Sequence, residues 1–120
     1  MILEDIEAKL KEIDPLVMYG MVDKSVREME WNYIVFNRTG VKYSANKTAA
    51  SDMFDVHIVR ENYVPDGTDT EVVEKLCSLP GVRVSGDAVF NYAMKPNTNV
   101  VVEMLTVSFE IGRASCRERV

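Results

Sequence analysis

The chain has 120 residues, 47% of them hydrophobic, and its 14 basic and 19 acidic residues give a formal net charge of −5. This length fits one domain with a single core. An acidic balance argues against nonspecific binding to nucleic acid or to an anionic membrane, because both need positive potential. No run approaches the roughly 20 apolar residues that span a bilayer, and no leader peptide is expected after Met1.

The last ten residues, 111–120, read Ile-Gly-Arg-Ala-Ser-Cys-Arg-Glu-Arg-Val. This is the translation of a common sequencing adapter in one frame, so we expect read-through and place the native domain at residues 1–110. Without the three arginines and one glutamate of this segment, the net charge changes from −5 to −5 − (3 − 1) = −7. Cys77 is then the single cysteine, which excludes an intramolecular disulfide and predicts a reducing environment.

Near the N-terminus, apolar residues recur every three or four positions among charged ones, which predicts an amphipathic helix with one buried stripe. The residues of this stripe are Ile2, Ile6, Leu10 and Ile13. Asp14-Pro15 ends the helix, because the residue before a proline is pushed out of the helical region. Residues 16–22 predict a short strand. Residues 31–37 are apolar on both faces, which indicates an interior strand or one facing a neighbouring subunit.

Residues 38–51 combine Gly40 with several Ser and Thr residues and no sustained apolar run, which predicts that at least the centre of this segment is an exposed loop at a hairpin-like reversal. The loop carries basic side chains and no acid. Most loop charges are simply solvated, but a flexible basic loop on an acidic body is also a candidate contact with a partner. The candidate contact residues are Arg38, Lys42 and Lys47.

Residues 52–63 alternate, with Phe54, Val56 and Ile58 on one face, and predict a strand with one buried side. A turn follows, and Thr68 and Glu71 then have the spacing of a capping box that begins a second helix. This helix ends before Pro80-Gly81. Because Cys77 falls near its end, where a thiolate is disfavoured, we expect a buried thiol.

Residues 82–95 and 100–109 alternate on either side of a polar turn and predict an antiparallel hairpin. Gly86 interrupts the first of these strands and indicates a bulge. The predicted order is therefore α-β-β-β-α-β-β. This order describes a single-domain α+β fold with two helices packed on a mostly antiparallel sheet.

His57 is the only histidine, and its predicted strand face also carries Asp55 and Glu61. A metal site needs a further ligand from elsewhere, and hydrolysis needs a nucleophile. We therefore interpret His57 as a surface or interface imidazole. The glycines form no phosphate-binding loop. The sequence thus predicts a protein that is not an enzyme, with no catalytic residues, no cofactor and no metal.

Three parts of the chain carry a resemblance to a known family: Trp31-Asn32-Tyr33-Ile34-Val35-Phe36, the strand and capped helix that begin at Phe54, and the closing hairpin. Together with the N-terminal helix, they resemble the small tail-terminator (tail-completion, minor tail) proteins of long-tailed bacteriophages. The resemblance covers essentially the whole of residues 1–110.

The resemblance implies a ring, usually hexameric, at the head-proximal end of the tail tube. Such a ring stops tube growth and presents a surface to the head-tail connector proteins. The expected partners are copies of the chain itself, the tail tube protein and the connector, while DNA passes through the bore without specific binding. The chain would lie in the virion after assembly in the host cytoplasm.

Two other readings stay open. A neck or head-tail adaptor protein of similar size would belong to the same machine. A dimeric α+β module that binds a small ligand belongs to a different class, with an enzyme third.

Overall fold

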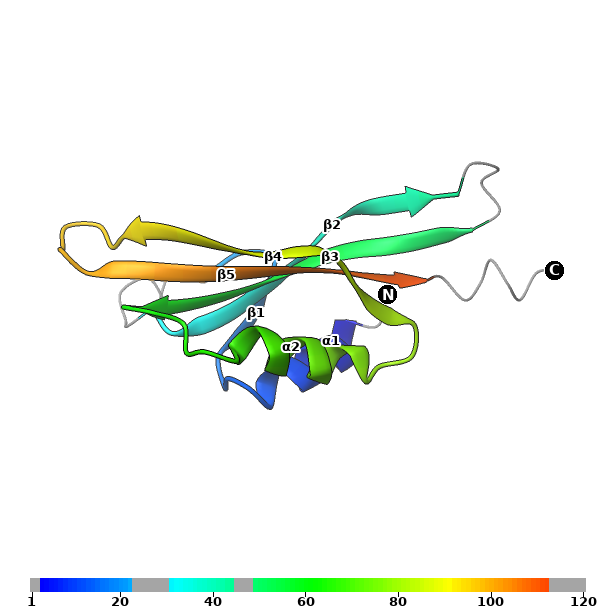
Figure 1. Cartoon of the computed structure of the whole chain (residues 1–120), viewed down its shortest axis with the longest axis horizontal. Helices are drawn as coiled ribbons and strands as arrows, with labels where there is room; N and C mark the ends of the chain where they lie inside the picture. Colours follow the sequence, from blue (N-terminus) through cyan, green and yellow to red (C-terminus); the bar gives the residue numbers. More distant parts are fainter. Residues whose placement is uncertain (1–2, 23–30, 45–48, 113–120) are drawn as a thin grey trace.

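The computed structural model describes residues 3–22, 31–44 and 49–112. These residues form two helices and a five-stranded sheet in the order α-β-β-β-α-β-β, which confirms the predicted single-domain α+β fold (Figure 1). Both helices lie on the same face of the sheet (Figure 1). The elements are α1 (Leu3–Lys11), β1 (Val17–Tyr19), β2 (Tyr33–Tyr43), β3 (Ala50–Glu61), α2 (Thr68–Cys77), β4 (Val82–Met94) and β5 (Val101–Gly112).

The strands lie in the order β1-β2-β3-β5-β4. β1 is parallel to β2, and the other neighbours are antiparallel, as predicted for a mostly antiparallel sheet. β1 has three residues and covers β2 only at residues 34–36. The rest of β2 and the whole of β4 therefore form the two long edges of the sheet.

The core lies between the helices and the sheet. Phe54 of β3 and Phe109 of β5 are fully buried there, with ring centroids 5.4 Å apart in a stacked arrangement. Fully burying one such apolar side chain contributes about 1.5–3 kcal/mol. The stripe predicted for the N-terminal helix is confirmed by Ile6 and Leu10, which have no exposed surface, while Ile2 lies outside the described residues. In α2, Val72 and Leu76 are buried to the same extent.

The first half of β2 is buried on both faces of the sheet, as predicted. Ile34 and Phe36 belong to the core under the helices, while Tyr33 and Val35 join a smaller apolar cluster on the opposite face. Partly buried side chains that flank this part of the chain pack against the second cluster: Leu16, Met18, Val22, Trp31 and Met104. This half of β2 is therefore an interior strand.

α2 does not begin with the predicted capping box. Its N-cap is Gly67, with φ at 88°, and no side chain caps the helix. Thr68 instead donates its hydroxyl hydrogen bond to the carbonyl of Pro65, at 2.7 Å. The prediction was wrong because the turn itself sets the entry into the helix, and glycine adopts a positive φ without steric cost.

β5 continues two residues past the expected boundary at residue 110. Ile111 stands in phase with Val107 and Phe109, pairs with Val82 and is buried. An apolar side chain at this position closes one end of the core. Residues 113–120 lie outside the described residues.

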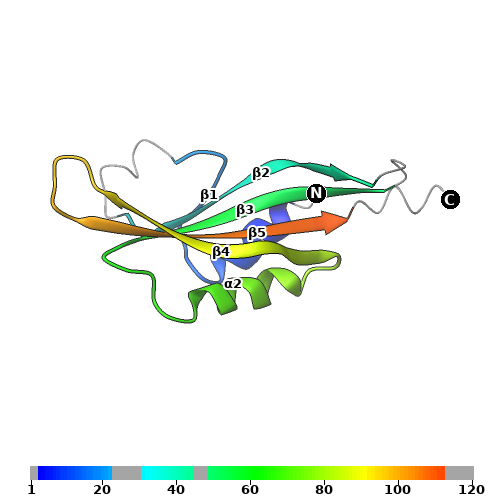
Figure 2. The same ribbon diagram turned by 45° about the horizontal axis from the view of Figure 1, so that its top comes forward.

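The sheet is longer than the helices that cover it. α2 has 10 residues and β4 has 13, which correspond to lengths of about 15 Å and about 43 Å. The β2–β3 hairpin therefore projects past the helices at one end, and the β4–β5 hairpin projects at the other (Figures 1 and 2). No helix in the described part of the chain is long and apolar enough to cross a membrane.

Candidate functional site

Two of the three predicted contact residues lie on the projecting half of β2. Arg38 and Lys42 are both exposed, and Lys47 lies outside the described residues. The Nε of Arg38 donates a hydrogen bond to the hydroxyl of Tyr19 at 3.0 Å, which holds this guanidinium beside β1. Lys42 stands opposite Ser51 of β3. The structure therefore places both cations on a strand and not on a loop.

The strands reach further into residues 38–51 than the composition indicated, and residues 45–48 at the centre of this segment lie outside the described residues. β2 extends to Tyr43, and β3 begins at Ala50. A β-bulge between Arg38 and Gly40 shifts the register of the pairing. The alternating pattern therefore breaks at the bulge and resumes one residue out of phase at Val41, which hides the second half of the strand from a search for strict alternation.

β4 is the most exposed strand in the described part of the chain. Of its 13 residues, Val82 alone is buried. The sequence predicted an apolar face for this strand, and the register confirms it, because Val84 and Phe90 pair with the buried Phe109 and Leu105. α2 contacts β4 but does not extend along its full length (Figure 1), so much of the apolar face of β4 remains in solvent. Exposed fractions are 49% for Phe90, 66% for Tyr92 and 58% for Met94.

The backbone of β4 also has a free side. The N–H of Lys95 donates to the carbonyl of Val100 at 3.0 Å and closes the hairpin. Residues of an antiparallel pair alternate between facing the partner strand and facing away from it. Counting back from Lys95 in this register, the N–H and C=O groups of Phe90, Tyr92 and Met94 point away from β5.

The second edge, on β2, has the same character. The N–H of Ser44 donates to the carbonyl of Ala49 at 3.0 Å. By the same alternation, the backbone groups of Val41 and Tyr43 point away from β3. Their side chains are 39% and 60% exposed. The site that the structure offers is therefore a pair of open sheet edges, on opposite sides of the molecule (Figure 2).

Sequence reasoning missed these edges as a site. Long edge strands are usually protected by a lysine, a proline or a covering element. Residues 88–94 read Ala-Val-Phe-Asn-Tyr-Ala-Met and contain no charge and no proline. That unprotected composition was the available signal, but it becomes meaningful only when the strand is known to lie at an edge.

His57 lies on the face of the sheet that the helices leave open. Its Nε2 is 3.0 Å from the Oδ1 of Asn37, and its Nδ1 is 2.8 Å from the Oγ1 of Thr106. Since Oδ1 can only accept, Nε2 carries the proton and the threonine hydroxyl donates to Nδ1. Burial lowers the pKa of His57, and the charge of Asp55 opposes this effect. In the described residues, no group of three or more His, Cys, Asp or Glu side chains is arranged to hold a metal ion.

Acid should weaken the fold through His57. Because the folded-state pKa lies below 6.5, the unfolded chain takes up a proton more readily, and the free energy of unfolding should fall as pH decreases from 6.5 toward the folded value. Each unit by which the pKa is lowered corresponds to about 1.4 kcal/mol. Denaturant unfolding measured between about pH 7 and about pH 5 should show this slope.

The substitution His57→Gln, which keeps a hydrogen-bonding side chain, should flatten that slope. Glu61 also titrates, but it changes the free energy of unfolding in a lower pH range than His57. Its pKa is lowered mainly by the N–H of Trp31 and then by Lys95, so its contribution is lost only as pH falls below 4.5. An unchanged slope in the His57→Gln variant would show that His57 is not the titrating group.

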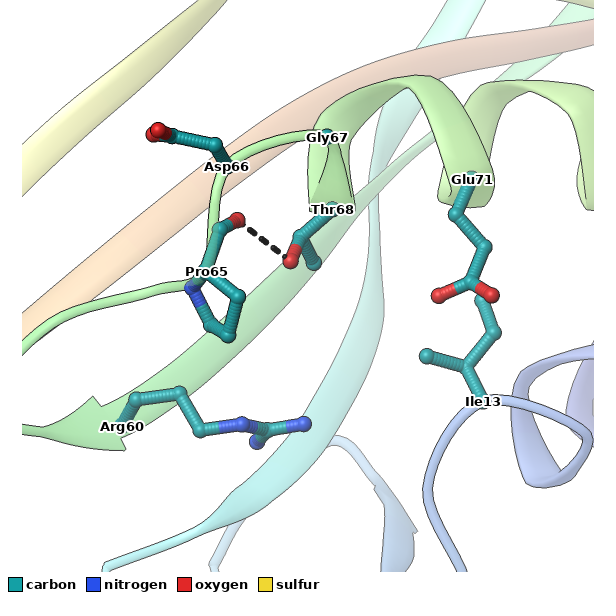
Figure 3. A pocket seen from close by; sticks show the side chains of 7 residues that line it. All are labelled: Ile13, Arg60, Pro65, Asp66, Gly67, Thr68 and Glu71. Atoms are coloured by element: carbon teal, nitrogen blue, oxygen red, sulfur yellow. Dashed lines mark hydrogen bonds between the residues drawn. The ribbon is translucent and has the colours of Figure 1, made fainter.

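A pocket of about 400 Å³ opens beside the start of α2 (Figure 3). Arg60 is the only basic side chain among the residues that line it, and it is already paired. Its Nη2 is 2.8 Å from the Oδ2 of the buried Asp14, and its Nη1 donates to the carbonyl of Val59 at 2.9 Å. Glu71 extends from α2 on the other side of the pocket. The pocket is lined by Ile13, Arg60, Pro65, Asp66, Gly67, Thr68 and Glu71.

This arrangement offers little chemistry. An anion entering the pocket would compete with Asp14 for Arg60 and would meet the carboxylate of Glu71. The hydroxyl of Thr68 is already donated to Pro65. Cys77 lies at the far end of α2 and is exposed, so the expectation of a buried thiol was wrong. It follows Leu76, which takes the inward position on the helix.

Sequence comparison assigns no family to these features. No family model and no curated protein matches this chain. The two open edges are therefore the structural feature that best indicates a function.

Proposed function

We propose that this chain is a structural virion protein that caps the growing tail tube of a long-tailed bacteriophage as a ring and forms the head-tail joining surface. The observation that carries the proposal is β4, a strand of 13 residues with one buried residue and an unpaired backbone edge. Such an edge gives lateral association both hydrogen-bonding groups and apolar side chains to remove from water. Residues 31–36 and the strand and helix after Phe54 resemble tail terminators. This resemblance is the reason for proposing a phage tail as the assembly.

The acidic charge suits this role. Six copies of residues 1–110, at −7 each, carry 6 × −7 = −42 in total, and a negative bore lets DNA slide without binding. Arg38, Lys42 and Lys47 are the proposed contacts with the tube protein or the connector. Arg38 and Lys42 support this because they stand exposed on a hairpin that projects past the helices.

A structural role, not an enzymatic one, is supported by the pocket beside α2. Its arginine is neutralised by Asp14, and its threonine hydroxyl is engaged by the backbone. A dimeric small-ligand module is the second candidate, because this pocket is large enough for a small polar molecule. A dimer formed through β4 would still leave the β2 edge exposed.

Tails assembled without this chain provide the test. In the phage that encodes it, a nonsense mutation in the gene should yield tubes of excessive and variable length that are not joined to heads, because nothing stops tube growth. Electron microscopy of the lysate measures the length distribution. Unjoined tails of normal length would instead favour the neck or adaptor reading, and normal joined tails would contradict both.

A further inference from the structure

We infer that the two open edges are partners: β4 of one copy pairs antiparallel with the projecting half of β2, residues 37–43, of the next copy. The closed ring rests on the proposed function. The pairing itself needs only a second copy of this chain.

Strand direction allows this pairing without turning the molecule over. Three antiparallel steps separate β2 from β4, through β3 and β5, so the two edge strands run in opposite directions. When two copies lie side by side with the same face upward, β4 of one therefore meets β2 of the other in antiparallel orientation. The outward groups of Phe90 and Tyr92 on one edge and of Val41 and Tyr43 on the other supply the ladder.

The side chains of the two edges also match in the face of the sheet that they use. Phe90 pairs with Leu105 and Val41 pairs with Asp52, and both partners are buried on the helix-covered face. The two rows are separated along β3, because Leu105 pairs with Ile58, six residues after Asp52. The neighbouring copies are therefore displaced along the strands by about 20 Å when these side chains meet. Most of the exposed apolar side chains of both edges thus lie on the helix-covered face and would meet across the new junction. They are Val84, Phe90, Tyr92 and Met94 on the β4 edge and Tyr19, Val41 and Tyr43 on the β2 edge. Val89 of β4, 49% exposed, lies on the opposite face, where it pairs with Thr106.

Charge favours pairing of unlike edges over pairing of two β4 strands. α2 contacts β4 and carries the exposed acids Asp69 and Glu74, and β4 carries the exposed Asp87. The cations on this side, Arg83 and Lys95, pair with Glu110 and Glu61 of the same copy. The β2 edge carries Arg38 and Lys42 with no acid between residues 37 and 44, and Arg38 lies on the helix-covered face because it pairs with Phe54. Two β4 edges would bring acids together, whereas β4 beside β2 brings acids beside Arg38. A two-fold pair would also leave the β2 edge exposed, whereas head-to-tail pairing repeats and can close as a ring.

Two edge-blocked variants test the pairing. Phe90→Pro removes an outward N–H from β4, and Val41→Pro removes one from β2, so neither takes a hydrogen bond from the sheet within one copy. Phe90→Lys and Val41→Lys form a second set. They keep the backbone N–H donors, but the charged side chain disfavours strand pairing at each edge. Tyr63→Lys is the matched control, because Tyr63 is 68% exposed and lies outside both edges.

The expected result is complementation. Each blocked variant alone should be monomeric, because every head-to-tail contact needs one intact β4 edge and one intact β2 edge. A 1:1 mixture should form a heterodimer and no larger species, through the intact β4 of one variant and the intact β2 of the other. Light scattering after size exclusion measures the masses, and circular dichroism confirms that each variant is folded.

Three outcomes overturn the inference: a β2-blocked variant that still pairs with itself, a mixture that stays monomeric, or wild-type assembly that both sets of variants leave unchanged. The last outcome leaves the proposed function standing with a different interface. If the variants abolish assembly but tails made without the chain have normal length and joining, the pairing stands and the proposed function fails.

Discussion

Replacing Phe109 by alanine is expected to lower the free energy of unfolding by about 3–5 kcal/mol. Phe109 has no exposed surface and stacks on Phe54, with ring centroids 5.4 Å apart. Its strand, β5, is central to the sheet and pairs on both sides, so the surrounding backbone cannot collapse into the cavity. Urea unfolding of the variant and of the wild type measures the difference.

Phe90→Ala is the matched control, since Phe90 lies on the same face of the neighbouring strand and is 49% exposed. In a dilute, monomeric sample this change should cost less than about 1 kcal/mol. At concentrations where copies associate, it should weaken assembly instead. Equal losses of unfolding free energy in the two variants would mean that the projecting half of β4 belongs to the core of the single copy.

The sequence predicted the order and type of every element in the described part of the chain, because each one carries either a clear period or a short apolar run. Ile6 and Leu10 mark a helical stripe, and Phe54 and Ile58 mark an alternating strand. Errors arose where local geometry breaks a period. The bulge after Arg38 hid the second half of β2, and a turn through Gly67 replaced the expected side-chain cap.

The candidate site was harder to predict, because periodicity identifies a face but not what covers it. The alternation in β4 correctly placed Phe90 on the helix-facing side, but α2 is too short to reach it. Long-range pairs were also missed. Asp14 was read as a helix stop, yet its carboxylate is buried 2.8 Å from Arg60, a residue that sequence gives no reason to bring there.

The largest expected effect is the assembly of copies of this chain into a closed ring. The open edges of β2 and β4 leave hydrogen-bonding groups and apolar side chains in water on two sides of each copy. Satisfying both edges of every copy requires a closed ring, since any open chain of copies keeps one free edge of each kind at its ends. The state that leaves no edge open should therefore be preferred over dimers and short oligomers.

The mass of the purified chain in solution tests this claim most directly. For a ring of six, light scattering should give 6 × 13.6 = 81.6 kDa, in a single species that does not grow further with concentration. Addition of the cognate tail tube should bind this species at the tube end. A chain that remains at 13.6 kDa at every concentration, with and without the tube, would contradict the account.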